Sequence, residues 1–130
     1  MTNKELDIIF KNLSKVNRGF PGNWEFEIDT TRFICLTDEH HNRMRIISPI
    51  TEVVNIDSDQ IVKCMEANFH TALDTKYAIS NGVVWSVFIH PLKELSQKQV
   101  IDAISQVYSS VKTFGTSYSS SNLIFPKSDL

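Results

Sequence analysis

The residues best suited to chemistry stand together in the segment Asp38-Glu39-His40-His41. Carboxylates and imidazoles are common ligands of divalent metals, and the same groups serve as general acids and bases. A metal site needs several ligands that converge from a defined scaffold, and no distant set of matching ligands is evident. We interpret the segment as a solvated turn. The alternative function is a small enzyme or metal-binding protein that uses His40, His41 and neighbouring acids.

The other reactive side chains have ordinary structural explanations. Cys35 lies in an apolar run and Cys64 in a helical pattern, where a reduced thiol usually serves as a small buried hydrophobic group. Two isolated cysteines provide neither a disulfide framework nor a CxxC zinc motif. The sequence also lacks a glycine-rich phosphate loop, a GxSxG elbow and an HExxH pair. It therefore predicts no catalytic residue, no metal and no cofactor.

Composition and charge exclude several classes of partner. The 130 residues, of which 42% are hydrophobic, suit one globular domain. Thirteen basic residues against fifteen acidic ones give a net charge of -2, and the basic residues are scattered along the chain, so no nucleic-acid partner is expected. No apolar run approaches the roughly 18 residues of a membrane span, and the first residues lack signal-peptide features. We expect a cytoplasmic protein without a membrane partner.

The first 48 residues predict a helix followed by three strands. Thr2 and Glu5 form a capping box, and the apolar spacing after them predicts an amphipathic helix that ends near Arg18-Gly19. Its polar face, either solvated or docked to an acidic partner, carries Lys4, Lys11, Lys15 and Arg18. An alternating strand at 24–29 and apolar strands at 33–36 and 43–48 then predict an antiparallel meander.

The second half predicts a helix, a hairpin and another helix. Asp57 or Ser58 caps a helix expected to be the main core helix, through Ile61, Val62, Met65, Phe69, Ala72 and Leu73. Asn81-Gly82 indicates a type I′ turn between strands 76–80 and 83–89, with Tyr77 opposite Ser86 and Ile79 opposite Val84. The last helix begins after Ser96 and stops at Gly115.

This order of elements predicts an α+β fold: helix, three strands, helix, two strands, helix, with a mainly antiparallel five-stranded sheet and helices packed on it. Residues 1–115 form the single expected domain. Residues 116–130 are rich in serine and are expected to form a flexible tail. The short apolar island Leu123-Ile124-Phe125 in this tail either docks on the body or binds a partner.

The second strand of the hairpin is apolar on both sides. Val83, Trp85, Val87 and Ile89 point one way, whereas Val84 and Phe88 point the other way, beside Tyr77 and Ile79. If helices cover only one side of the sheet, the second set is exposed and marks a binding surface. The residues assigned to a partner or dimer interface are Tyr77, Ile79, Val84 and Phe88. The alternative is that the third helix or the tail covers them within the monomer.

A family resemblance covers nearly the whole chain to about Gly115. It rests on the segments 65–74, 76–79, 82–92 and 112–115 and on Arg43-Met44-Arg45-Ile46 before Pro49. These segments resemble bacterial YbjN-like proteins and the wider superfamily of type III secretion chaperone-like domains. The resemblance implies a small non-enzymatic domain, chaperone-like or regulatory, that acts as a homodimer and binds a client or partner protein. The near-balanced charge departs from the strongly acidic composition typical of true secretion chaperones.

Overall fold

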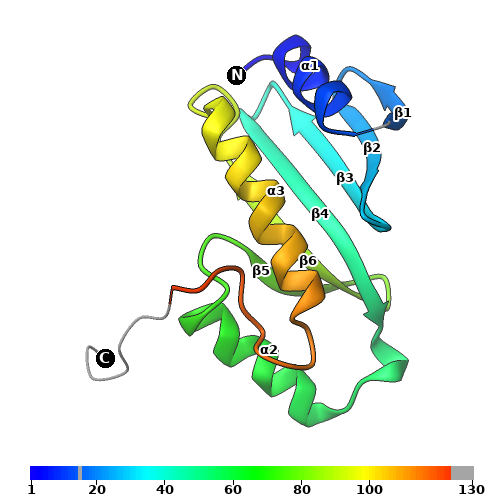
Figure 1. Cartoon of the computed structure of the whole chain (residues 1–130), viewed down its shortest axis with the longest axis vertical. Helices are drawn as coiled ribbons and strands as arrows, with labels where there is room; N and C mark the ends of the chain where they lie inside the picture. Colours follow the sequence, from blue (N-terminus) through cyan, green and yellow to red (C-terminus); the bar gives the residue numbers. More distant parts are fainter. Residues whose placement is uncertain (15, 124–130) are drawn as a thin grey trace.

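The computed structural model describes residues 1–14 and 16–123, and its strands form one antiparallel sheet (Figure 1). The elements are α1 (Asn3–Leu13), β1 (Val16–Phe20), β2 (Asn23–Ile28), β3 (Thr31–Asp38), β4 (Arg43–Glu52), a 3₁₀ turn (Val53–Asn55), α2 (Ser58–His70), β5 (Lys76–Ser80), β6 (Val83–His90) and α3 (Gln97–Lys112). The sheet order is β1-β2-β3-β4-β6-β5. The predicted α+β class is confirmed, with six strands in place of five.

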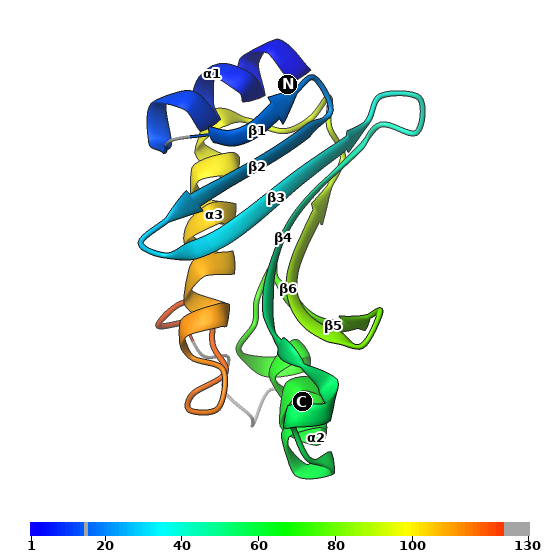
Figure 2. The ribbon, with the colours of Figure 1, turned by 90° about the vertical axis from the view of Figure 1, so that its right-hand side faces the viewer.

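The helices are distributed unevenly around the sheet. Both α1 and α3 lie against one face, and α2 lies near β5 at the far end of the molecule (Figure 2). The opposite face is not covered by any helix within the part of the chain that the structure describes. No helix of the described residues is long and apolar enough to cross a membrane. We call the face under α1 and α3 the inner face and the opposite one the outer face.

An aromatic cluster holds α1 and the first strands together on the inner face. Phe10 of α1 stacks on Phe26 at 4.7 Å between ring centroids and meets Trp24 edge-on at 5.3 Å. Phe26 stacks in turn on Phe33 at 5.3 Å. All four rings are fully buried, and the core continues into α3 through Val100, Ala103, Ile104 and Val107. Burial of such large rings is the main stabilising contribution at this end of the sheet.

The predicted end of the first helix is wrong. Helix α1 stops at Leu13, and Ser14 already has extended backbone angles. The next residues form β1, which pairs with β2 and places Val16 opposite Phe26. Pairing with an open sheet edge satisfies backbone groups that a longer helix would have satisfied internally. Arg18 therefore lies on β1 rather than on the basic helix face, and Lys15 lies outside the described residues.

The prediction that the second helix is the main core helix is also wrong. Only Cys64 and Ala67 of α2 are buried. Val62, Met65 and Phe69 are 54%, 67% and 67% exposed. The core helix is α3, which buries six residues against the sheet. An amphipathic pattern predicts that a helix has an apolar face, but not that its own chain covers that face.

The hairpin is confirmed in its turn and its register. Asn81 and Gly82 both have positive φ, as a type I′ turn requires. Tyr77 pairs with Ser86, and Ile79 with Val84. A second turn with two positive φ values, at Asp29 and Thr30, joins β2 to β3.

Part of the expected tail packs on the body, which corrects the expectation of flexibility from residue 116 onward. Tyr118 and Ser120 are buried, and the Thr71 hydroxyl donates to the carbonyl of Tyr118. The ring of Tyr118 packs against Tyr77 and Phe114. Residues 124–130, including two residues of the apolar island, lie outside the described residues.

Candidate functional site

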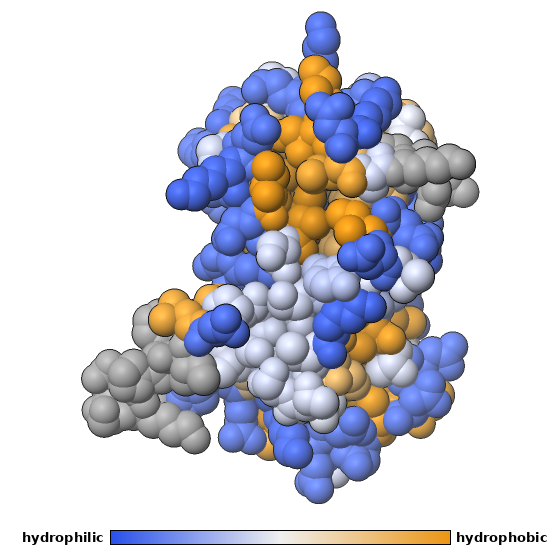
Figure 3. All heavy atoms as spheres, in the orientation of Figure 1, coloured by the Kyte–Doolittle hydropathy of each residue, from blue (hydrophilic) through white to orange (hydrophobic). Residues whose placement is uncertain are grey.

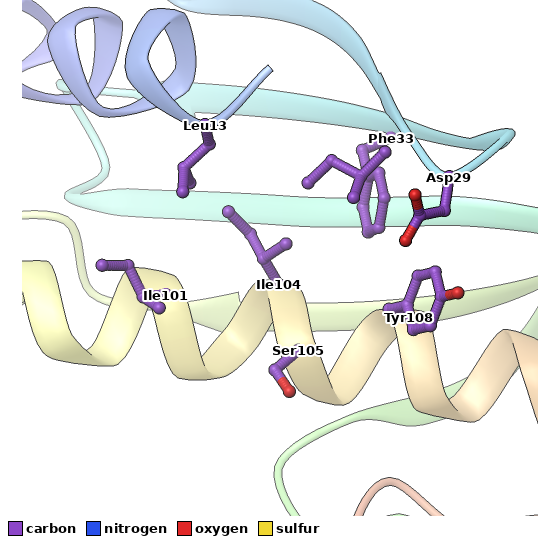
Figure 4. A pocket seen from close by; sticks show the side chains of 8 residues that line it. Leu13, Asp29, Phe33, Ile101, Ile104, Ser105 and Tyr108 are labelled. Carbon is purple, nitrogen blue, oxygen red and sulfur yellow. The ribbon is translucent and has the colours of Figure 1, made fainter.

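A hydrophobic groove runs between α1, α3 and the turn that joins β2 to β3. One hollow of about 200 Å³ is lined by Leu13, Ile28, Asp29, Phe33, Ile101, Ile104, Ser105 and Tyr108 (Figure 4). A second, of about 230 Å³, is lined by Met1, Glu5, Ile8, Ile9, Asn12, Leu13, Gln97 and Ile101. Leu13 and Ile101 line both hollows, which are therefore adjacent, and we call the two together the α1–α3 groove. Figure 3 shows apolar surface gathered over this junction.

The groove combines a buried floor with exposed apolar walls. Phe33 and Ile104 belong to the core and close its base. Ile8, Leu13 and Ile101 stand on the walls and are 54%, 40% and 44% exposed. Exposed aliphatic side chains around a hollow are typical of a surface that buries another apolar group.

Three side chains with polar atoms border the first hollow, whose lining is otherwise apolar. Asp29 carries its carboxylate on the β2–β3 turn, and Figure 4 shows it facing the ring of Tyr108 from α3. The Lys112 amine lies 5.3 Å from the centre of the Tyr108 ring, on the same helix. Ser105 is exposed nearby. Among the described residues, the lining of the two hollows contains no histidine or cysteine.

Helix α1 is held in place by a charged contact with the sheet. The indole N–H of Trp24 donates to the Asp7 carboxylate at 2.9 Å, and the Lys11 amine lies 2.7 Å from the same carboxylate. The Lys11 and Trp24 contacts lower the pKa of Asp7, because both stabilise its ionised form. Since Leu13 sits on the last turn of α1, this contact helps to set the position of one groove wall.

The four residues predicted for a partner interface are not equally accessible. Tyr77, Val84 and Phe88 are buried within the single chain, whereas Ile79 is 53% exposed. The Tyr77 hydroxyl donates to the Ser110 carbonyl at 2.8 Å, and burial raises the pKa of Tyr77 to about 12. An interface role for these residues stays a prediction. Tyr77, Ile79 and Val84 line a surface hollow of about 130 Å³ beside α2, and Phe88 does not line it.

The more exposed side of the hairpin is the one that carries Val83, Trp85, Val87 and Ile89. Among its outward-facing residues, Ile89 is 53% exposed, and Val83, Trp85 and Val87 are half-buried. The groove residues were not singled out from the sequence. Leu13 and Ile101 belong to the apolar repeats of their helices, but periodicity does not show which members of a repeat remain uncovered.

The histidine segment forms the exposed β3–β4 turn. His41 Nδ1 lies 2.9 Å from one Asp38 carboxylate oxygen, and the His41 amide donates to the other at 3.0 Å. These hydrogen bonds lower the pKa of Asp38. Within residues 1–14 and 16–123, no three His, Cys, Asp or Glu side chains gather closely enough to hold a metal ion. Cys35 and Cys64 are buried free thiols, as predicted, and burial raises the pKa of each.

Comparison with known proteins establishes the fold. No protein-family model and no curated protein matches the sequence. Solved structures do match, among them the HopA1–SchA chaperone–effector complex, with a TM-score of 0.65, 11% identity, and coverage of 86% of this chain and 94% of that chain. The Yersinia pestis type III secretion chaperone SycH in complex with a YscM2 fragment matches with a TM-score of 0.66 and 9% identity, over 86% of this chain and 98% of that chain. The ExsC–ExsE complex matches with a TM-score of 0.65 and 9% identity, over 88% of this chain and 97% of that chain.

These matches show that the chain has the fold of type III secretion chaperones. The fold that the sequence resemblance implied is therefore confirmed.

The contact between Asp7 and Trp24 predicts a pH-dependent stability. A carboxyl with a lowered folded-state pKa contributes stability above its unfolded value of about 3.9, and this contribution is lost as the pH falls through the folded value. We expect Asp7→Asn to reduce the free energy of unfolding at pH 7 and to flatten its decline below about pH 4. Urea unfolding from pH 7 to pH 2.5 tests this, and parallel profiles for the two proteins would contradict it.

Proposed function

We propose that this protein is a non-enzymatic protein-binding domain that holds an apolar segment of a partner in the α1–α3 groove. The observation that carries the proposal is the exposed apolar side chains of Ile8, Leu13 and Ile101, which line two adjacent hollows. The similar structures support it, since all three are described as complexes with a second protein. The alternative of an enzyme or metal protein using His40 and His41 has less support, because both side chains are exposed on a turn.

The groove suits an extended or helical segment with two or more large apolar side chains. Such side chains would remove both themselves and the exposed groove walls from water, which is the dominant favourable term in protein association. Asp29 and Tyr108, which line the first hollow, would orient the segment through hydrogen bonds. A partner of this kind is either a client or a regulator, and the groove chemistry serves both roles.

We further propose that the protein acts as a homodimer through the exposed face of α2. Val62, Met65 and Phe69 lie on one side of this helix and are more than half exposed. A hollow of about 130 Å³ between α2 and the hairpin brings Met65 and Ile79 to one surface. A single apolar face that includes a helix is suited to a self-complementary twofold contact, the commonest arrangement of soluble oligomers. Three of the four predicted interface residues, Tyr77, Ile79 and Val84, line this hollow, and Ile79 is the exposed one among them.

We also propose that the protein is bacterial and cytoplasmic and that it is related to YbjN-like proteins. A bacterial source, a cytoplasmic location and kinship with YbjN-like proteins rest on the sequence features and the resemblance described above.

The dimer predicts a specific response to charge on α2. We expect the native protein to be a dimer at micromolar concentration. The double variant Met65→Asp with Phe69→Asp should raise the dissociation constant of the dimer by at least about 30-fold, because a buried aromatic anchor commonly contributes about 2 kcal/mol or more. Lys63→Asp, on an exposed position of the same helix, is the matched control and should leave it intact. Sedimentation velocity measures all three proteins. A native protein that is still monomeric at the highest concentration measured, about 50 μM, would contradict the dimer proposal.

If the groove holds a partner, binding of that partner should depend on the apolar side chains of the groove walls. Affinity purification from the native cell extract, with quantitative mass spectrometry, should recover a protein that Leu13→Asp with Ile101→Asp captures at least about tenfold less. Lys98→Asp is the control, since Lys98 is exposed on α3 but does not line the groove. Circular dichroism verifies that each variant is folded. Equal capture by the groove variant and the control would remove the groove from the proposal.

A further inference from the structure

The outer face of the sheet is unusually apolar for a surface without a helix on it. Antiparallel sheets with one face toward solvent normally carry polar side chains on that face. Strand β2 follows this rule with Glu25 and Glu27, which point away from the buried Trp24 and Phe26. Strands β3, β4 and β6 do not follow it, since their outward positions hold Ile34, Leu36, Ile47, Trp85, Val87 and Ile89.

These residues form contiguous rows across three strands. Ile34 pairs with Ile47, and Ile47 pairs with Val87, so three aliphatic side chains stand side by side. In the neighbouring row Leu36 pairs with Arg45 and Arg45 pairs with Ile89. Directly opposite side chains on one sheet face lie about 5 Å apart, so each row is one continuous surface. Figure 2 shows this side of β4 and β6 free of helices.

A cation stands at the centre of this surface. Arg45 is exposed between Leu36 and Ile89, and Arg43 is exposed two residues earlier on the same face. Among the described residues neither arginine forms an ion pair, whereas Arg32 on the same face is paired with Glu25 at 2.7 Å. A hollow of about 430 Å³ at this end of the sheet is lined by Leu36, Thr37, Asp38, His41, Arg43, Met44, Arg45 and Ile89.

The acidic groups near the hollow do not neutralise Arg45. The Asp38 carboxylate accepts two hydrogen bonds from His41, on the turn side of the hollow. Glu25 is engaged by Arg32, and Glu27 lies on β2, opposite Arg32 in the register. The centre of the outer face is therefore positive and apolar, with acidic groups at its margins. The acidic margin disfavours a phosphate backbone, which needs an uninterrupted basic surface.

We propose that the outer sheet face is a second protein-binding surface, separate from the α1–α3 groove, that takes an extended acidic segment of a partner. The segment presents an Asp or Glu flanked on the same side by large apolar residues. Its carboxylate pairs with Arg45, whose planar guanidinium donates two parallel hydrogen bonds to the carboxylate oxygens. Its apolar side chains cover the row of Ile34, Ile47 and Val87. The charge selects the partner, and the apolar burial supplies most of the affinity.

A pair of synthetic peptides tests the proposal. The first repeats Ile-Ser-Glu-Ser-Leu-Ser, which places Ile, Glu and Leu on one side of an extended chain, and the second has Lys in place of Glu. Fluorescence anisotropy at low salt should give at least about tenfold tighter binding of the acidic peptide by the native protein. Arg45→Glu should abolish or reverse this preference, and Ile89→Asp should weaken binding of both peptides. Absence of binding, or a preference unchanged in Arg45→Glu, overturns the proposal.

Three controls assign the binding to one surface. Lys98→Glu on α3 makes the same change of charge type away from the outer face and should leave the preference intact. If Leu13→Asp with Ile101→Asp removes binding while Arg45→Glu does not, the peptide occupies the groove, which overturns this proposal and leaves the proposed function standing. If Arg45→Glu converts a dimer into a monomer in sedimentation, the occupant is a second copy and the proposal is also wrong. Thermal unfolding by circular dichroism verifies that each variant is folded.

Discussion

In the part of the chain that the structure describes, helices cover one face of the six-stranded sheet and leave the other uncovered, and the exposed apolar surfaces follow from that constraint. On the inner face α3 and the aromatic ring of Phe10 complete a dry core that includes Trp24, Phe26 and Phe33. Each central strand therefore buries alternate residues. Apolar residues on the outer face have no covering helix in the described part of the chain, and α2 leaves most of its apolar side exposed. A fold of this kind has more apolar surface than its own elements cover, which favours a role in binding proteins.

Local rules predicted the parts of the fold that local chemistry decides. The alternation of Trp24 and Phe26 with acids identified a strand with one dry face, and Asn81-Gly82 defined a turn whose register the structure confirms. The capping boxes at Thr2 and Ser96 marked true helix starts. In each case the signal lies within a few residues and does not depend on distant contacts.

Tertiary contacts decided what the sequence alone did not reveal. Val16 continues the apolar period of α1, yet pairing with Phe26 at an open sheet edge takes it into a strand. The sequence indicated that β6 is apolar on both sides, which is correct, but periodicity does not identify the side that meets α3. The interface residues were therefore chosen on the buried side, with Phe88 as an example, while Ile89 faces solvent. The sequence did not predict the groove either, because periodicity does not show which apolar residues of α1 and α3 remain exposed.

The serine-rich segment shows why composition misled. Its polarity suggested a flexible tail, but its Ser120 joins a hydrogen-bond network around the buried Gln106. Gln106 accepts hydrogen bonds from the Asp74 amide and the Ser120 hydroxyl, and it donates to the carboxylates of Asp74 and Asp102. Polar residues pack in a core when their hydrogen bonds are satisfied there.

The accessibility of the outer face is tested most directly with the two tryptophans, one on each side of the sheet. Trp24 is fully buried on the inner face, whereas Trp85 is half-buried on the outer face and donates its indole N–H to the Ser80 carbonyl. Acrylamide quenching of Trp24→Phe and Trp85→Phe compares the remaining indole in each protein. We expect Trp85 emission to be red-shifted and several-fold more strongly quenched than Trp24 emission. Equal protection of the two indoles in the free protein would mean that the outer face is covered and would contradict this account.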